Sequence, residues 1–273
     1  MTTPSQTQTL TTQRKTALIT GASSGIGLDF AHLFAEGGHD VVLVARGEEK
    51  LKALAEELSS KHGVRAVALP ADLADAAAPA KLVEALKARG LTVDVLVNNA
   101  GFASYGAFAE ADAENELRMI QVNVTTLTAL TRLLLPDMVA RKAGRILNVA
   151  STAAFQPGPL MAVYYATKAY VLSLSEALAN ELDGTGVTVT CLCPGPTKTG
   201  FQERARMEES KLVKGKDIMD SRTVARAGYD GLFRGQAVVV PGFMNKMLAT
   251  SVRFLPRGAV TRIVRNTQER AHA

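Results

Sequence analysis

The sequence has no tryptophan, only two cysteines and only four histidines among its 273 residues. The cysteines, Cys191 and Cys193, stand two positions apart in an apolar run, which places both side chains on one face of a strand. Two thiols without neighbouring histidines are too few ligands for a metal site, so we predict no metal centre. Cysteines outside a disulfide framework are typical of a reducing compartment, and we expect a cytoplasmic protein.

Two further absences concern membranes and charge. No apolar run reaches the roughly 18 residues that a membrane-spanning helix needs. Residues 1–14 are rich in Thr and Gln and lack the apolar core of a signal peptide, which predicts a disordered lead-in. From Pro241 onward there are six basic residues and one acidic residue, which account for the whole formal net charge of +5. The rest of the chain is balanced in charge, and we expect no nucleic-acid partner.

Short apolar runs alternate with helix-like segments along residues 15–241. Most of the runs are continuous and β-branched, as in parallel strands that are covered on both faces. Repeated strand–helix alternation predicts a single α/β domain with a doubly wound parallel sheet of about seven strands. The predicted strands are Thr16–Thr20, Val41–Ala45, Ala66–Leu69, Val93–Val97, Arg145–Ala150, Val187–Cys193 and Ala237–Val240.

A glycine-rich turn follows the first predicted strand and opens a helix-like segment. Its glycines let the backbone turn tightly and approach a pyrophosphate, whose negative charge is favoured at a helix N-terminus. The turn therefore predicts a dinucleotide site, and its alternative is a plain strand–helix turn. The residues assigned to this site are Gly21, Ser23, Ser24, Gly25, Ile26 and Gly27.

The end of the second predicted strand distinguishes NAD from NADP. An NAD site places Asp or Glu there to accept hydrogen bonds from the ribose hydroxyls. This chain has Val44-Ala45-Arg46 instead, and a guanidinium pairs well with a 2′-phosphate. Arg46 therefore predicts NADP(H) as the cofactor. The alternative is that Arg46 is a solvated loop residue, with Glu48 nearby.

Tyr164 and Lys168 stand four residues apart in a long helix-like segment, so they share one helix face. A phenol is a weak base at neutral pH, and a nearby cation favours its ionised form, so we expect a lowered tyrosine pKa. Ser151 ends the fifth predicted strand, at the same edge of the sheet, where its hydroxyl can polarise a substrate carbonyl. The three residues suit proton transfer to or from a carbonyl oxygen. The Tyr-x-x-x-Lys spacing alone favours an ordinary helix, because tyrosine and lysine are common on helices.

These motifs, with several others in the same order, resemble the short-chain dehydrogenase/reductase (SDR) family over residues 15–241. The resemblance implies a Rossmann-type fold and an NADP(H)-dependent oxidoreductase that interconverts a carbonyl and an alcohol. It also implies a homodimer or homotetramer. The other matching motifs are Asp72-Leu73, Asn98-Asn99-Ala100-Gly101, Asn123, and Pro194-Gly195 followed by Thr197 and Thr199.

The resemblance also implies the roles of the catalytic residues. Tyr164 is expected to be the general acid/base and Ser151 to hold the substrate oxygen. Lys168 is expected to bind the nicotinamide ribose and lower the pKa of Tyr164. Asn123 is expected to hold a water of the proton relay, although it lies in a predicted helix, residues 119–130, where a solvated polar residue is the alternative.

The remaining residues of the resemblance are expected to contact the cofactor. Asp72, with Leu73, is assigned to the adenine end, and its alternative is an N-cap of a predicted helix over residues 74–86. Further along, Asn98, Ala100 and Gly101 are expected to line the cofactor cleft. The nicotinamide amide and the phosphates are assigned to Pro194, Gly195, Thr197 and Thr199.

Residues 102–108 and 152–163 are rich in apolar side chains, and we expect them to form a pocket for a lipophilic ketone, aldehyde or 3-oxoacyl group. Residues 198–220 are expected to form a mobile lid. The alternatives to this enzyme are a non-catalytic nucleotide sensor or scaffold on the same fold, and an isomerase or dehydratase. A sensor or scaffold has no need for Ser151, Tyr164, Lys168 and Asn123 together.

Residues 242–273 form a basic C-terminal extension with two helix-like segments, 244–255 and 258–266. A basic amphipathic helix is able to lie on a membrane surface. We favour instead packing on a partner subunit or over the substrate cleft.

Overall fold

The computed structural model describes residues 14–201 and 218–269. The predicted lead-in lies almost entirely outside the described residues, as does most of the predicted lid. Within the described ranges, no helix combines the length and the apolar character that crossing a membrane requires.

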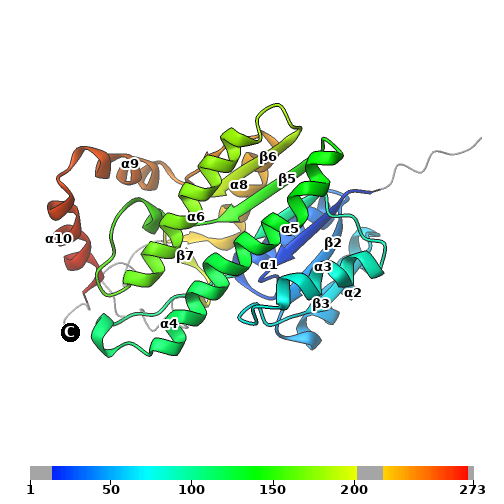
Figure 1. The fold of residues 1–273 in the computed structure, drawn as a ribbon, viewed down its shortest axis with the longest axis horizontal. Coiled ribbons are helices and arrows are strands. Elements are labelled where there is room, and N and C mark those ends of the chain that lie inside the picture. The colour runs from blue at the N-terminus through cyan, green and yellow to red at the C-terminus, as the bar shows by residue number, and fades with distance from the viewer. Residues whose placement is uncertain (1–13, 202–217, 270–273) are drawn as a thin grey trace, which may run out of the picture.

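The core of the protein is a seven-stranded parallel sheet with the strand order β3-β2-β1-β4-β5-β6-β9 (Figure 1). Each apolar run predicted as a strand forms one of these strands, which confirms the doubly wound α/β fold. The order reverses between β1 and β4, and in such sheets ligands bind at that point, outside the carboxyl ends of the strands. The strands are β1 (Thr16–Thr20), β2 (Asp40–Ala45), β3 (Ala66–Pro70), β4 (Val95–Asn98), β5 (Gly144–Val149), β6 (Val187–Leu192) and β9 (Val238–Val239).

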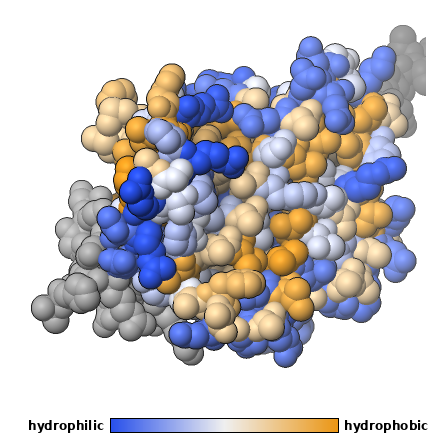
Figure 2. All heavy atoms as spheres, turned by 60° about the vertical axis from the view of Figure 1, so that its left-hand side comes forward, coloured by the Kyte–Doolittle hydropathy of each residue, from blue (hydrophilic) through white to orange (hydrophobic). Residues whose placement is uncertain are grey.

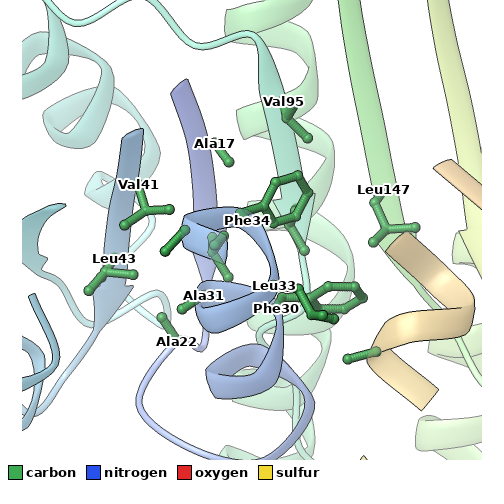
Figure 3. Close-up of a cluster of buried hydrophobic side chains, with 14 of the residues drawn as sticks. Ala17, Ala22, Phe30, Ala31, Leu33, Phe34, Val41, Leu43, Val95 and Leu147 are labelled. Carbon is green, nitrogen blue, oxygen red and sulfur yellow. The ribbon is translucent and has the colours of Figure 1, made fainter. Parts of the chain in front are cut away.

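Apolar side chains on both faces explain why the central strands read as continuous runs. Ala17 and Ile19 of β1 point into one buried cluster, while Leu18 between them points into another. The first cluster is filled by Phe30 and Phe34, which come from the helix after β1 (Figure 3). Successive side chains of a strand point to opposite faces of the sheet. A strand that is buried on both faces therefore has apolar residues at successive positions, without polar residues between them.

Helices cover both faces of the sheet. One cluster contains side chains of α1 (Gly25–Glu36), α2 (Glu48–His62) and α8 (Ser221–Phe233). The helices on the opposite face are α3 (Ala78–Ala88), α5 (Leu127–Ala140) and α6 (Ala162–Glu181).

Several short elements carry no clear pattern in the sequence. The segment predicted as one helix over residues 119–130 is divided into α4 (Ala113–Ile120), the π-helical turn η2 (Gln121–Thr126) and α5. A two-stranded parallel sheet joins β7 (Thr197–Lys198) to β8 (Met219–Asp220). Two-residue strands are too short for hydrophobic alternation to reveal them. Two further short helices are η1 (Phe108–Glu110) and η3 (Thr152–Phe155).

The C-terminal extension contains α9 (Phe243–Ser251), η4 (Val252–Phe254) and α10 (Arg257–Gln268), which lie at one end of the molecule (Figure 1). Val260 and Val264 of α10 are buried in a cluster with Tyr164 and Tyr165. The helix therefore packs beside the N-terminal part of α6. On the outer side, large apolar side chains are exposed near basic ones (Figure 2).

Candidate active site

A cavity of about 750 Å³ lies at the carboxyl ends of the central strands. It extends from the glycine-rich turn and the end of β2 to the N-terminal half of α6. The parallel sheet brings most of the residues predicted for the site into its wall. These are Gly21, Ser23, Ser24, Gly25, Ile26, Arg46, Asp72, Leu73, Ala100, Gly101, Ser151, Tyr164, Lys168, Pro194, Gly195, Thr197 and Thr199. Gly27, Asn98 and Asn123 are not among the residues that line it.

The glycine-rich turn has the geometry of an anion site. Gly21 and Gly25 have positive φ angles of 68° and 55°, a conformation that disfavours any side chain. A Cβ on Gly27 would lie 2.2 Å from the carbonyl oxygen of Gly21, so this position requires glycine although it faces away from the cavity. The first turn of α1 leaves N–H groups without helical partners, and Ser24, its N-cap, makes no side-chain capping bond within the described chain. These N–H groups fit the pyrophosphate of a dinucleotide.

Asn99 supports this turn, whereas the sequence analysis had chosen its neighbour Asn98. The Nδ2 of Asn99 donates to the carbonyl oxygen of Thr20 at 2.9 Å, and the hydroxyl of Thr20 accepts from the main-chain N–H groups of Asn99 and Ala100. Asn98 is buried and donates instead to Thr131 and Asn148. The expectation that Asn98 lines the cleft is therefore wrong. Adjacent residues at a strand end point in different directions, and the sequence does not say which of two asparagines faces the turn.

Two cations lie at the end of β2. Arg46 lines the cavity, as does Lys50 in the first turn of α2. Glu48, the acid that the alternative interpretation of Arg46 invoked, forms an ion pair with Lys52 at 2.8 Å. Lys50 was missed by the sequence analysis. Its position four residues after Arg46, at the start of a helix, is the signal that points to it.

Asp72 lines the cavity together with Leu73. Its Oδ1 accepts a hydrogen bond from the N–H of Ala74 at 3.0 Å, within the loop. The N-cap alternative is wrong because α3 begins at Ala78, not at residue 74, and Ala77 is its N-cap.

Three side chains with acid–base and hydrogen-bonding groups meet at the other end of the cavity. Tyr164 and Lys168 lie on one face of α6, with the lysine Nζ 5.7 Å from the centre of the tyrosine ring. This Nζ donates to the carbonyl oxygen of Val149 at 2.8 Å, which anchors it to the end of β5. Ser151 lies just beyond β5 and caps η3, and its hydroxyl also donates to the carbonyl oxygen of Pro194 at 3.3 Å.

Burial dominates the electrostatics of this cluster. It raises the pKa of Tyr164 well above the ordinary value of 10.0, and a hydrogen bond with Ser151 opposes this rise only in part. Burial also lowers the pKa of Lys168 from 10.5 to about 8. The expected lowering of the tyrosine pKa is therefore wrong for this structure, since desolvation outweighs the hydrogen bond with Ser151. The phenol is protonated at neutral pH, as a proton donor must be.

Asn123 lies behind the cavity, in the π-helical turn η2. Its Nδ2 donates to the carbonyl oxygen of Phe102 at 3.0 Å and to the hydroxyl of Thr167 at 3.1 Å. Its Oδ1 accepts from the N–H of Phe102 at 3.2 Å. The solvated-residue alternative is wrong, because Asn123 is buried and joins the loop after β4 to α6.

The end of the cavity around Tyr164 contains several apolar side chains. Its wall includes side chains from both pocket segments that the sequence predicted, with Phe201 from the start of the predicted lid. Phe108, at the end of the first segment, is exposed and does not line the cavity. Outside the predicted segments, the cavity is also lined by Tyr165 and Gln268, and by Asn115, Arg118 and Val122. The apolar residues are Phe102, Ala103, Met161 and Phe201.

The described residues contain no group of three or more His, Cys, Asp or Glu side chains that could hold a metal ion. Cys191 and Cys193 are free and buried on the sheet, with their sulfur atoms 3.7 Å apart. They pack in a cluster with Val171 and Leu172 of α6.

One cavity connects the glycine-rich turn at the N-terminus of α1 with a buried tyrosine and lysine. This arrangement is typical of a nicotinamide-dependent oxidoreductase. Residues 15–210 match the family model described as short chain dehydrogenase. The chain belongs to this family, the short-chain dehydrogenases/reductases.

Individual relatives agree with this assignment. A short chain dehydrogenase of Pseudocercospora fijiensis is 38% identical over 189 residues, which cover 68% of this chain but only 61% of that protein. The ketoacyl reductase HetN of Nostoc sp. is 35% identical over 214 residues, covering 78% of this chain and 73% of HetN. Among solved structures, a short-chain dehydrogenase from Sphingobium yanoikuyae in complex with NADPH is 36% identical, with a TM-score of 0.80 over 95% of this chain and 98% of that one.

Proposed function

We propose that the protein is an NADP(H)-dependent reductase that converts a lipophilic ketone, aldehyde or 3-oxoacyl group to an alcohol, with Tyr164 as the proton donor. The observation that carries this proposal is one continuous cavity. Its cationic end holds Arg46, and its opposite end brings together Tyr164, Ser151 and Lys168. In this proposal residues 15–241 form the catalytic domain and residues 242–273 form a C-terminal extension, whose helix α10 packs against Tyr164 and Tyr165.

The cofactor preference is supported by the residues around the end of β2. A 2′-phosphate is a dianion near neutral pH, and Arg46, Lys50 and Ser23 offer two cations and a hydroxyl beside the glycine-rich turn. The NADPH complex of the Sphingobium enzyme is consistent with this preference. At the nicotinamide end, Gly195, Thr197 and Thr199 are assigned to the carboxamide and phosphates.

The chemistry divides between the cofactor and the side chains. The nicotinamide, when bound, supplies the hydride. Ser151 holds the carbonyl oxygen and Tyr164 donates a proton to it, while Lys168 binds the nicotinamide ribose through its ammonium group. Asn123 positions the loop at Phe102 against α6, since its amide group is occupied by protein partners. We therefore assign Asn123 a supporting role in the proton relay.

The apolar wall supports a lipophilic substrate, and the ketoacyl reductase HetN supports the carbonyl class. Exposed Leu117 and Leu133 lie on α4 and α5, where an apolar surface suits a homodimer or homotetramer. Asn115 and Arg118 of α4 line the cavity, so this surface lies close to the site.

A survey of carbonyl compounds tests the proposed activity. Purified protein is mixed with NADPH and a panel of ketones, aldehydes and 3-oxoacyl thioesters, and loss of NADPH absorbance is followed. We expect turnover with at least one lipophilic member, and slower turnover with NADH. Binding of NADPH without oxidation by any member would favour the nucleotide-sensor alternative. Conversion of a hydroxyacyl substrate without a change in the cofactor would favour the dehydratase or isomerase.

The pH dependence of the rate depends on Lys168. Its pKa of about 8 means that the buried ammonium loses its charge as the pH rises through about 8, not through the ordinary value of 10.5. We expect kcat/KM for carbonyl reduction to fall above about pH 8, because this parameter reports groups of the free enzyme. In Lys168→Arg the guanidinium stays charged at high pH. The decrease in kcat/KM is therefore expected at higher pH than in wild type, independently of the absolute rate of the variant. A wild-type profile that stays flat to pH 10 contradicts this role.

A further inference from the structure

The last residue of α10, Gln268, places a buried amide in the cavity wall. It is 1% exposed and lines the same cavity as Ser151 and Tyr164. Val260, Val264 and Gln268 are spaced by four residues, so they share the helix face that packs over the site. Apolar contact satisfies the two valines, but a buried amide requires hydrogen bonds.

Two tyrosines hold Gln268 in place. Its Nε2 donates to the hydroxyl of Tyr165, the neighbour of Tyr164 on α6. The hydroxyl of Tyr105 donates to its main-chain carbonyl oxygen at 2.6 Å. These bonds fix the end of α10 and the plane of the amide with respect to the cavity.

The amide oxygen of Gln268, Oε1, is buried. It makes no hydrogen bond among the described residues. An unpaired buried acceptor is destabilising, and native proteins contain few of them. Gln268 lines the cavity, and a bound molecule that donates a hydrogen bond to its Oε1 would supply the missing partner.

We propose that Gln268 is a specificity-determining residue, whose Oε1 accepts a hydrogen bond from a hydroxyl or amide N–H of the substrate, away from the carbonyl that is reduced. The proposal rests on the carbonyl reductase activity proposed above. Because Phe102, Met161 and Phe201 make the surrounding wall apolar, the substrate class is a lipophilic carbonyl compound with one polar donor group. The C-terminal extension thereby selects among the substrates that the catalytic residues are able to reduce.

Matched ketones test this role. A series of 2-ketones with a terminal hydroxyl is compared with terminal methoxy ketones of the same carbon chain, which keep the oxygen but donate no hydrogen bond. We expect wild type to prefer the hydroxy ketone about tenfold in kcat/KM, mainly through KM, at the chain length that reaches Gln268. Gln268→Met has a similar length and no acceptor oxygen. It is expected to remove the preference for the hydroxy ketone over the methoxy ketone.

Two further variants separate recognition from structural support. Tyr165→Phe leaves the amide but removes the hydroxyl that holds it, so a partial loss of preference is expected. Thr267→Val alters the adjacent residue, which does not line the cavity, and should keep the full preference. Melting temperatures of all variants are measured by circular dichroism.

A hydroxy-over-methoxy preference that survives in Gln268→Met overturns the assignment, as does a wild type without preference at any chain length. If wild type reduces none of these ketones and no member of the carbonyl panel, the proposed function itself fails, and the specificity assignment fails with it.

Discussion

Tyr164→Phe is expected to reduce kcat for carbonyl reduction by about two to four orders of magnitude, the usual range for loss of a general acid. The ring remains, so its packing against Tyr165 and Phe201 is preserved and the affinity for NADPH should change little. Steady-state rates give kcat, and fluorescence titration gives the dissociation constant of NADPH.

Tyr170→Phe is the matched control for this variant. Tyr170 lies on the same helix, but its hydroxyl contacts Thr128 at 3.0 Å outside the cavity. The control should retain wild-type kcat. A Tyr164→Phe enzyme with most of its activity would contradict the catalytic assignment, and Tyr165 would then be the next proton donor to test.

Arg46→Ala is expected to weaken NADPH binding by about ten- to a hundredfold. A charge-assisted hydrogen bond to the 2′-phosphate is worth roughly 1.5–3 kcal/mol, and each 1.4 kcal/mol is a factor of about ten. Since Lys50 also lines this end of the cavity, the lower part of the range is expected if the lysine compensates. NADH lacks the phosphate and should bind the variant as it binds wild type. The ratio of kcat/KM for the two cofactors measures the effect.

Ala45→Asp should change the cofactor preference in the same direction by another route. A carboxylate at the end of β2 repels the phosphate and accepts hydrogen bonds from free ribose hydroxyls, so NADH should gain relative to NADPH. Arg89→Ala, at the end of α3, removes an exposed arginine that does not line the cavity and serves as the control. A wild type that already prefers NADH, or a ratio unchanged by Arg46→Ala, refutes the assignment of NADP(H).

The sequence by itself determined the sheet and most of the residues that line the cavity. Continuous β-branched runs predict buried parallel strands because both faces of such strands need apolar side chains. The carboxyl ends of those strands meet at one edge, so the turn at Gly21–Gly27, Arg46, Ser151 and Tyr164 were expected near one another before any contact was known. This information is local, since it depends on periodicity, strand ends and spacing within one helix.

Only the tertiary structure decided how these residues are used. Asn99, and not Asn98, supports the glycine-rich turn because of the direction in which each side chain leaves the end of β4. The pKa of Tyr164 is raised because the surrounding chain buries the phenol, and its spacing from Lys168 in the sequence does not reveal this burial. Gln268 reaches Tyr165 across 103 positions of sequence. These features depend on contacts between segments that are far apart in the sequence. The local sequence pattern does not specify which of those segments come into contact.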